Sequence, residues 1–441
     1  MNNISAVSGL MKLLNFQDSQ VWEFPKMHDR DDSIVKYDTK IIDEDHHGMG
    51  TLENADRFHF TTKNEDLWFL PSESYLLVKC RLRKEDNTAY RWADVAAQVG
   101  PPVVPAQAAE VVTIDDNAFN IFKEARYLID DQKVESIEYL GISTLVDNIF
   151  TYNDDVKEKN ARHSQLWFRN DDAARMTYVR ECQGTLQLLL PLSRIFPFCK
   201  YAKHVFRGVK HRIEFTLNDA NNLVYRGAGV ENGRVKVLEM RWVVPYVEPS
   251  LTMMAKLETQ LATNSTFEIN WPAINVFQHQ PAQNQKLRIP LNATVHKPTK
   301  IVVITQNLNR TTSQEHNSLE FDHLDLTECF VEINGVKYPE TPIKTDFDER
   351  DIQTAYHNFL KFCDNGVSCV NMEMFRAYYP LMCIDVSQHP PQLYENSSFP
   401  NIVINMEFEN APANDFLVWV IVYNDRQAKF MLDQKKTRVI M

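Results

Sequence analysis

The stretch "EARYLIDDQKVESIEYLG" (residues 124–141) decides the fold, because a near-copy, "ECFVEINGVKYPETPIK", follows at residues 328–344. In the first copy the pattern predicts a strand that ends at Ile129, a turn at Asp130–Asp131 and a returning strand. The second copy has Asn-Gly at its turn, a favoured pair for a tight hairpin. A chain that repeats such a hairpin after a long interval is expected to contain two related domains.

A helix is predicted after each hairpin. Ser136 would cap the first turn of the first helix, and the second helix would span residues 348–362. The apolar residues that would line one side of these helices are Ile137, Leu140, Leu145 and Ile149 in the first, and Ile352, Tyr356 and Leu360 in the second.

Two further landmarks recur in the same order. The predicted strand "LLLPLSRIFPF" (188–198) is echoed by "YYPLMCIDVSQ" (378–388), with Pro191 matching Pro380, and "HRIEFTLND" (211–219) is echoed by "NIVINMEFEN" (401–410). A polar loop at residues 151–183 would be shorter in the second copy. Kept strands and altered loops are typical of duplicated β-domains. The chain is therefore predicted to be all-β, with two tandem eight-stranded jelly rolls and short helices in the loops.

The predicted domain borders follow from these landmarks. They give an N-terminal arm (1–55), a first jelly roll (56–250), a second jelly roll (251–425) and a C-terminal tail (426–441). The arm carries an apolar stripe at helical spacing, which we expect to dock on another surface. Its members are Ile4, Val7, Leu10, Met11 and Leu14. The tail is locally basic and is predicted to be a solvated end, with contact to an acidic surface as the alternative.

Composition bounds the function. Apolar residues make up 44% and charged residues 24% of 441 residues, as in ordinary globular proteins. The net charge of −12 argues against tight direct contact with nucleic acid, whose phosphates need clustered Lys and Arg. The longest apolar run, "FLVWVIVY" (416–423), is too short to cross a bilayer as a helix, and no signal peptide is visible. The seven cysteines are scattered and predicted to be reduced and mostly buried.

No motif for a nucleotide, a catalytic serine or a zinc protease is present in the sequence. The clusters that could carry chemistry all have a simpler interpretation as solvated turns, buried thiols or hydrogen-bonded histidines. Neither a catalytic nor a metal or cofactor site is predicted. The residues weighed for such roles are Asp43 to His47 in "DEDHHGMG", Cys363 and Cys369 with His357, His211, His279, His389, Asp154, Asp155, Asp171 and Asp172.

The repeated pattern resembles one known family. The order "LIDDQKVES", a helix, "LLLPLSRIFPF" and "HRIEFTLND" is similar to the first jelly roll of double jelly-roll major capsid proteins, including those of Polinton or Maverick elements and adintoviruses. The sequence departs from that family at Asp130–Asp131, where Gly is frequent, and in having fewer aromatics at 192–198. The resemblance covers about residues 56–425.

This resemblance implies a structural, non-enzymatic role in a virion. Three copies would form a pseudo-hexagonal trimer that tiles an icosahedral shell and contacts minor or penton proteins and an internal membrane. The loops at 85–113 and 151–183 would form an outward tower. One alternative is a carbohydrate-binding protein made of two β-sandwiches, for which Trp68, Trp92 and Trp167 are candidate platforms. A cupin-like enzyme is a second alternative, although the sequence has no His-x-His pair.

Overall fold

The computed structural model describes residues 34–45, 52, 55–62, 68–97, 106–152, 155–169, 171–262, 266–291, 295–388, 400–433 and 436–440, and every structural statement below concerns these residues. The apolar stripe at residues 4–14 lies outside them. Among the helices described, none has the length and apolar character needed to span a membrane.

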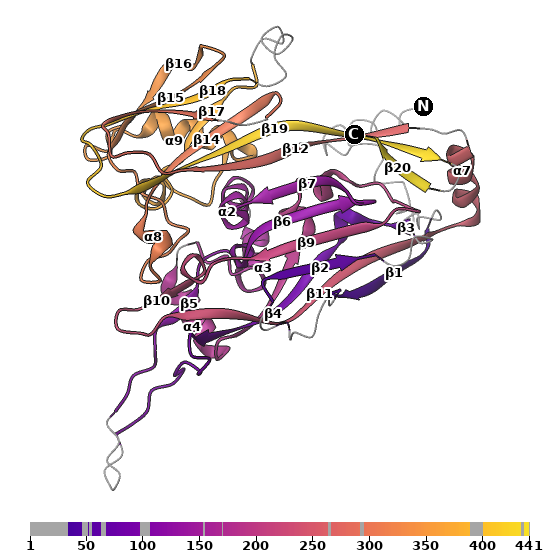
Figure 1. The fold of residues 1–441 in the computed structure, drawn as a ribbon, viewed down its shortest axis with the longest axis horizontal. Coiled ribbons are helices and arrows are strands. Elements are labelled where there is room, and N and C mark those ends of the chain that lie inside the picture. The colour runs from indigo at the N-terminus through magenta and orange to yellow at the C-terminus, as the bar shows by residue number, and fades with distance from the viewer. Residues whose placement is uncertain are drawn as a thin grey trace, which may run out of the picture.

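The first half of the chain forms two facing sheets (Figure 1). One runs β1-β11-β4-β8, with the short β3 beside β11, and the other runs β2-β9-β6-β7. The bounds are β1 Ile34–Asp43, β2 Arg57–Thr61, β3 Trp68–Phe69, β4 Tyr75–Lys84, β6 Phe122–Ile129, β7 Gln132–Glu138, β8 Thr185–Pro191, β9 His211–Leu217 and β11 Gly233–Pro249. A separate pair joins β5 (Val112–Ile114) to β10 (Val224–Arg226).

The second half repeats this arrangement. Its sheets run β12-β19-β14-β17, with β20 added beside β19, and β13-β18-β15-β16. The bounds are β12 Thr266–His279, β13 Lys286–Leu291, β14 Pro298–Asn307, β15 Leu326–Ile333, β16 Val336–Lys344, β17 Met382–Asp385, β18 Ile402–Phe408, β19 Phe416–Asp433 and β20 Lys436–Ile440. If the additional strands β3, β5, β10 and β20 are set aside, each half has eight strands. Numbered along the chain, these have the order 1-8-3-6 in one sheet and 2-7-4-5 in the other in both halves. The predicted pair of eight-stranded jelly rolls is confirmed.

The repeated hairpins are β6–β7 and β15–β16, which occupy the same position in the two halves. Both turns have two residues with positive φ, as in a type I′ turn, whose twist matches that of the flanking strands. Asp130 and Asp131 have φ of 48° and 62°, and Asn334 and Gly335 have φ of 51° and 82°. The departure at Asp130–Asp131 therefore keeps the same turn geometry with aspartates in place of glycine.

Helices fill the connections. Their bounds are α2 Leu140–Thr151, α3 Asp155–Ser164, α4 Asp172–Glu181, α5 Leu192–Ile195, α6 Pro197–Tyr201, α7 Leu251–Ala262, α8 Asn309–Thr312, α9 Gln353–Phe362 and α10 Met372–Ala377. Single turns of 3-10 helix lie at η2 Pro71–Glu73, η3 Ala118–Ile121, η4 Ala220–Asn222 and η5 Asp364–Gly366.

Several local predictions were wrong. Ser136 caps no helix, because β7 continues through it and Tyr139, with φ of 52°, ends the strand before α2. The segment 151–183 is not a loop, since it contains α3 and α4. The strand predicted to reach residue 198 stops at Pro191, where α5 and α6 take over.

The landmark prolines are not equivalent. Pro191 is the last residue of β8, whereas Pro380 precedes β17, although the two strands occupy the same place in their sheets. The second predicted helix exists but begins at Gln353, five residues later than expected from residue 348. The match between β8 and β17 was therefore right, but the alignment of Pro191 with Pro380 was wrong.

Residues near the predicted borders pair into the sheets. The strand β1 lies inside the expected arm and pairs with β11 along nearly its whole length. At the other end, β19 continues to Asp433 and β20 folds back on it. The border at residue 250 coincides with the start of α7, which connects the two halves and leaves Leu251 85% exposed.

The two hydrophobic cores exchange residues across the halves. In Figure 1, β12 and β19 run from the second half across the first, alongside β7. Their far ends place Trp271 and Phe430 in the first core, where Phe198 packs 5.2 Å from Trp271 and Phe206 packs 5.3 Å from Phe430 between ring centroids. In return, α2 of the first half contributes Val146 and its neighbours to the second core. Neither half completes its core alone.

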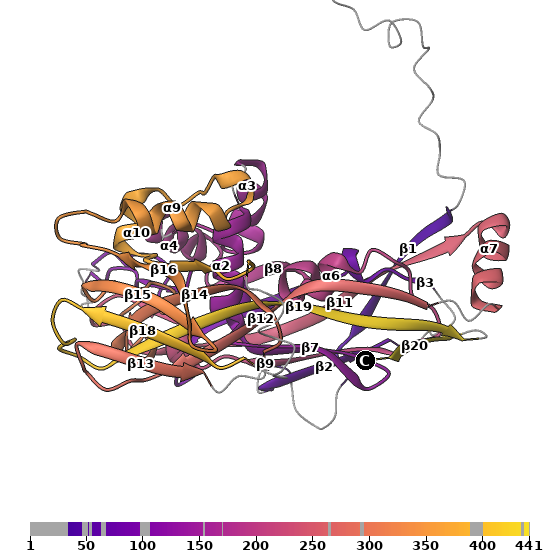
Figure 2. The ribbon, with the colours of Figure 1, turned by 90° about the horizontal axis from the view of Figure 1, so that it is seen from above.

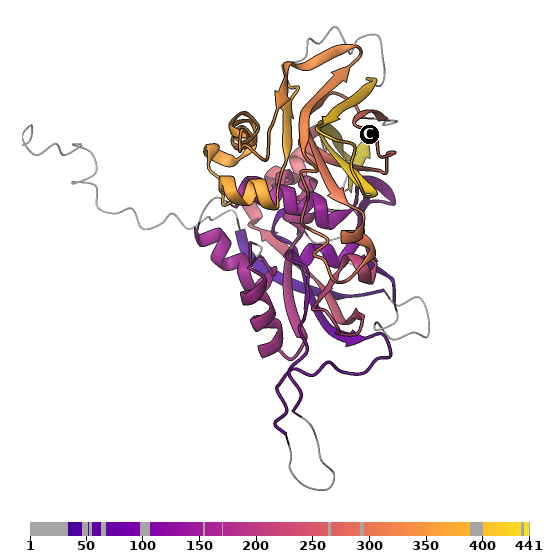
Figure 3. The ribbon, with the colours of Figure 1, turned by 90° about the vertical axis from the view of Figure 1, so that its left-hand side faces the viewer.

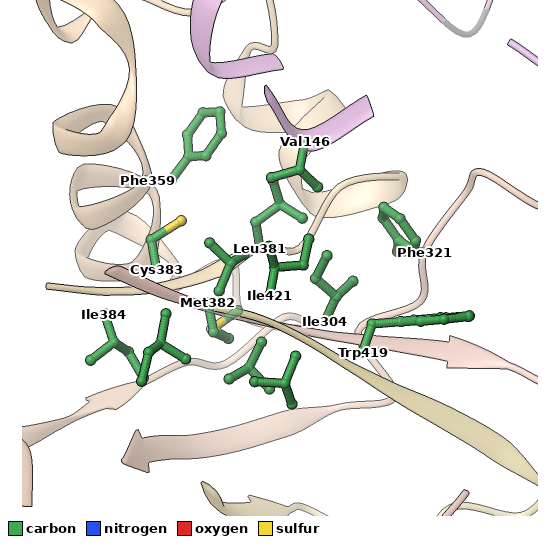
Figure 4. Close-up of a cluster of buried hydrophobic side chains, with 14 of the residues drawn as sticks. Val146, Ile304, Phe321, Phe359, Leu381, Met382, Cys383, Ile384, Trp419 and Ile421 are labelled. Carbon is green, nitrogen blue, oxygen red and sulfur yellow. The ribbon is translucent and has the colours of Figure 1, made fainter. Parts of the chain in front are cut away.

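The equivalent sheets differ on their outer faces. In β4, buried residues alternate with partly exposed ones, whereas β14 has an uninterrupted buried run from Ile301 to Gln306. Figure 2 shows the reason: α9 and α10 form a layer on the side of the second-half sheet away from β13 and β18. In Figure 4, Phe359 of α9 and Val146 of α2 lie on the side toward which Cys383 points.

Candidate functional site at the junction of the two halves

A loop of the second half is inserted into the first half. The Gln314 side chain is 2% exposed and pairs with the backbone of Gly233: its Oε1 accepts from the Gly233 N–H at 2.7 Å and its Nε2 donates to the Gly233 carbonyl at 2.9 Å. The Arg226 N–H donates to the Gln314 carbonyl at 2.8 Å. A Cβ at position 233 would lie 2.1 Å from the Tyr90 hydroxyl, so a larger residue there would displace Tyr90.

Four residues further on, Ser318 binds a buried carboxylate of the first half. Its N–H and its hydroxyl donate to Asp115 Oδ2 at 3.0 Å and 2.6 Å. Burial raises the pKa of Asp115 to about 7, although the Ser318 hydrogen bonds and the charge of Arg175 act in the opposite direction. The junction therefore contains a carboxyl group that is partly protonated near neutral pH.

A buried arginine organises the same region. Arg175 of α4 is fully buried and its Nη2 lies 2.6 Å from Asp172 Oδ1, while its Nη1 lies 3.9 Å from Asp116 Oδ1. The Phe168 N–H donates to the same Asp116 oxygen at 2.7 Å. A charge without water needs such partners, since removal of one leaves the other buried and uncompensated. These contacts hold α4 against the body of the first half.

A second buried acid lies where β12 crosses the first half. Glu135 of β7 is 1% exposed, and its Oε2 accepts from the Phe198 N–H at 2.9 Å. Burial raises the pKa of Glu135 to about 8, against the effects of that N–H and of Arg426 in the second half. Sequence reasoning missed Asp115, Glu135 and Arg175, because partners far apart in the chain give no local signal.

A polar cavity of ≈ 230 Å³ lies between the halves. Asn120 and Ser318 contribute to its wall, and Tyr139 and Trp419, whose ring centroids are 5.0 Å apart, meet across the junction there. A Cβ at Gly141 would lie 1.9 Å from Asn120 Oδ1, so glycine allows α2 to approach this close. The start of α2 and the second-half sheet therefore meet beside this cavity, through the contact between Tyr139 and Trp419.

The two segments predicted to form a tower lie side by side. Arg180 of α4 donates from Nε to the Trp92 carbonyl at 3.0 Å and pairs with Asp94 at 3.4 Å. A Cβ at Gly184 would lie 2.2 Å from the Trp92 ring, which shows how closely the segments pack. Figures 1 and 3 show the extended segments at residues 90–97 and 106–111, which are joined by the isolated bridge Val95–Gln107, projecting from the end of the first half.

The aromatic residues proposed as a carbohydrate platform are mostly inside the protein. Trp68 is 8% and Trp167 is 2% exposed, so neither offers a ring face to a sugar. Trp92 is partly buried, with its ring centroid 5.8 Å from that of Tyr90. The structure therefore contradicts this set as an exposed platform.

The histidine and cysteine candidates are placed as structural groups. His211 is buried and its Nδ1 lies 2.9 Å from the Tyr127 hydroxyl, and burial lowers its pKa to about 3. Burial also lowers the pKa of His279. Burial raises the pKa of the Cys363 thiol to about 11, which leaves little thiolate at neutral pH. Five of the seven cysteines are buried, as predicted, and His389 lies outside the described residues.

The acidic candidates have ordinary partners. Asp43 lies 3.6 Å from Arg241, and His46 and His47 fall outside the described residues. Asp171 caps α4 by accepting from the Ala174 N–H at 3.0 Å. In the part of the chain that the structure describes, no three His, Cys, Asp or Glu side chains converge as a metal site would require. Asp154 is outside that part as well.

Comparison with known proteins agrees with this architecture. The family model for the double jelly roll-like domain matches residues 112–427. The chain is similar to the Faustovirus major capsid protein, at 8% identity and a TM-score of 0.58 over 96% of this chain and 97% of that chain. It is also similar to VP54 of PBCV-1 fitted into a reconstruction of the virophage Sputnik (12%, 0.56, over 95% and 100%) and to the mavirus major capsid protein (10%, 0.51, over 97% and 95%). No curated protein sequence matches the chain.

Proposed function

The chain belongs to the double jelly roll-like domain family, and from this premise we propose that it is the major capsid protein of a virus or virus-like element. The observation that carries the proposal is the repeated strand order, 1-8-3-6 and 2-7-4-5 in both halves, combined with similarity to viral major capsid proteins along almost the whole chain. Its role in this proposal is structural and not enzymatic.

We propose that three copies form a pseudo-hexagonal ring. Two similar halves held at one angle give each chain two nearly equivalent wedges, and three such chains supply six. The interlocked cores and the buried Gln314 and Ser318 contacts support this, because they prevent the halves from rotating independently. A closed ring requires a head-to-tail contact in which the second half of one copy meets the first half of the next. Such rings would tile an icosahedral shell.

The packed segments at residues 85–113 and 151–183 would face outward as a tower. Their mutual contacts through Arg180 and Trp92 support a single projecting unit. The N-terminal stripe and the basic residues after 425 are proposed to face inward, toward neighbouring copies, a minor or penton protein, or an internal membrane. The net charge of −12 favours a shell wall that does not itself grip nucleic acid.

The narrower assignment to Polinton or Maverick elements and adintoviruses rests on the order of motifs between residues 124 and 219. The similarity to the mavirus protein gives the fold alone at 10% identity. The genomic surroundings of the gene test this assignment: a gene within an element integrated in a host genome is the expected result, and a gene carried only by a large DNA virus would contradict it.

Electron microscopy and sedimentation of the purified full chain test the function itself. Trimers at micromolar concentration, and hexagonal rings or shells on coexpression with neighbouring genes, are the expected results. A protein that stays monomeric, builds no ordered assembly and binds sugars on a glycan array would favour the carbohydrate-binding alternative. Deleting residues 1–15 is expected to impair particle assembly while leaving the trimer intact.

A further inference from the structure

Register identifies equivalent positions on the outer faces of the two large sheets. Tyr75 lies opposite Pro191, the last residue of β8, and Lys300 lies opposite Asp385, the last residue of β17. Following the same rows across each sheet, Ile41 corresponds to Ile274, Leu77 to Val302 and Leu189 to Cys383.

These equivalent residues differ sharply in exposure. Ile41, Leu77 and Leu189 are 55%, 37% and 36% exposed. Ile274, Val302 and Cys383 are 7%, 0% and 2% exposed. Because apolar side chains gain stability when they leave water, an open row of this kind is a candidate contact surface.

The cover of the second-half sheet comes partly from the other half of the chain. The helix α2 follows the hairpin β6–β7 of the first half, yet Leu145, Val146 and Ile149 belong to the second core. Only Asp147 of its twelve residues is not buried, since α2 lies between the two halves. A first-half helix therefore covers a second-half sheet within one chain.

The equivalent helix of the second half has one side free. The helix α9 follows the hairpin β15–β16 and buries Ala355, Phe359 and Phe362 against its own sheet. Its opposite side exposes Gln353, Thr354, His357 and Lys361. In a ring of alternating halves, this free side stands where α2 contacts its neighbour.

The charges on the outer face of the first-half sheet indicate which surface of another copy it would contact. The outer face of the first-half sheet carries basic residues directly opposite each other, Arg81 beside Lys236 and Arg83 beside Arg234, while Lys79 stands opposite Glu239, which also pairs with Arg241 at 2.6 Å. A pocket of ≈ 210 Å³ is lined by Arg81, Arg83 and Lys236. Like charges on opposing strands repel each other, so a surface with this arrangement favours an anionic partner over a cationic one.

An acidic segment stands in the corresponding place of the second half. Residues 346–351 read "DFDERD", with four acidic residues and one Arg, and all of the charged ones are exposed. Only Ile352 separates this segment from α9, and Tyr139 directly precedes α2. Tyr139 packs on Trp419, which pairs with Ile304, and the first-half equivalent of Ile304 is Lys79, two positions from Arg81.

We propose that the outer face of β1-β11-β4-β8 is the docking surface for the second half of another copy. The segment 346–351 lies over Lys79, Arg81 and Lys236. The free side of α9 lies toward Ile41, Leu77 and Leu189, where the methylene stems of its polar side chains cover apolar surface while their polar ends stay in water. The inference rests on the proposed trimer and names the two surfaces that close it. The contact repeats between copies the arrangement that α2 makes within one chain.

Charge reversal in the full-length chain tests the pairing by sedimentation velocity. The first variant is Lys79→Glu with Arg81→Glu, and the second is Asp348→Lys with Glu349→Lys. Each is expected to raise the midpoint concentration of trimer assembly about tenfold or more, because like charges then face each other. The chain carrying all four substitutions is expected to form trimers again, since the two surfaces are complementary once more.

A matched control reverses two exposed cations elsewhere, Lys286→Glu with Arg288→Glu on β13, and should leave the trimer unchanged. Far-UV circular dichroism establishes that each variant is folded, and Leu77→Gln with Leu189→Gln provides an uncharged second test of the same face. If the variants at Lys79 and Arg81, at Leu77 and Leu189, and at Asp348 and Glu349 all form trimers as readily as the wild-type chain, the docking surface is overturned while the proposed trimer stands. A wild-type chain that is only monomeric would overturn both. Failure of the fourfold variant to reassemble would overturn the pairing.

Discussion

The two halves have the same eight strands in the same order, but only one of the two large sheets is covered on both faces. In the second half, α9 and the first-half helix α2 lie over Ile274, Val302 and Cys383. In the first half, the corresponding residues Ile41 and Leu77 remain open to water. The difference shows that equal strand order does not give equal surfaces. Within one chain, helices cover the outer face of the second-half sheet, and no helix covers the described outer face of the first-half sheet in the same way.

The largest expected effect comes from removing the cover of the second-half sheet. Phe359→Ala is expected to lower the free energy of unfolding by about 3–5 kcal/mol, because the fully buried ring contacts both the sheet and Phe150 of α2. Urea unfolding at a concentration where the chain is monomeric measures it. The control Tyr378→Ala removes an aromatic ring that is 38% exposed and should cost about 1 kcal/mol or less. Equal losses would contradict the covered-face description.

A matched pair of isoleucines sharpens the comparison. Ile274→Ala is expected to cost about 2 kcal/mol or more in the monomer, since its side chain is packed under α2. Ile41→Ala is expected to change monomer stability by about 0.5 kcal/mol or less, because its side chain is in water. The effects on assembly should be the reverse of those on monomer stability: Ile41→Ala should raise the midpoint concentration of trimer assembly, and Ile274→Ala should not. Chemical unfolding and sedimentation read these two quantities separately.

An effect that is smaller for each pH unit distinguishes the junction within the chain from the open face. The folded-state pKa of Asp115 is raised to about 7, above the ordinary value near 4, so unfolding releases a proton between these values. Stability from this group is therefore greatest in acid and falls by up to about 1.4 kcal/mol for each pH unit between pH 4 and pH 7. Asp115→Asn should lack this slope. Unfolding curves of the two proteins that stay parallel across this range would show that Asp115 does not titrate there.

The smallest expected effect concerns salt. The Debye length falls from about 10 Å at 0.1 M to about 3 Å at 1 M ionic strength, which weakens contacts between exposed charges. The midpoint concentration of trimer assembly should rise over this range, and Lys79→Gln with Arg81→Gln should flatten the dependence. Analytical ultracentrifugation in matched buffers checks both. The stability of the monomer should change little, because its junction contacts are buried.

The fold was largely predictable because its signals are local. The hairpin signature at 124–141 and its copy gave the equivalence of β6–β7 and β15–β16, and the landmarks at 188–198 and 211–219 with their copies indicated β8, β9, β17 and β18. The strands β1, β12, β13 and β14 were not predicted. The helices α3 and α4 were missed because a polar composition was interpreted as a loop. Their good helix formers, and Asp171 ahead of "DAARM", were the signal that could have found them.

The junction could not be predicted from the sequence. Ser318 and Asp115 lie 203 positions apart, and nothing near either residue announces the other. Ile41 and Ile274 are the same residue in similar strands, and their different burial follows from the helices that pack over one sheet and not over the other. The run "FLVWVIVY" did carry a hint, because a strand that is apolar on every residue is typical of a sheet covered on both faces.

The crossing of β12 and β19 over the first core has a consequence for synthesis. A ribosome that stops before residue 266 releases a first half whose Phe198 and Phe206 lack Trp271 and Phe430. Such a fragment would expose apolar side chains of an incomplete core, and it is expected to aggregate or be degraded. A first half can therefore complete its core only after translation has passed residue 430, so only full-length chains are expected to enter the proposed assembly.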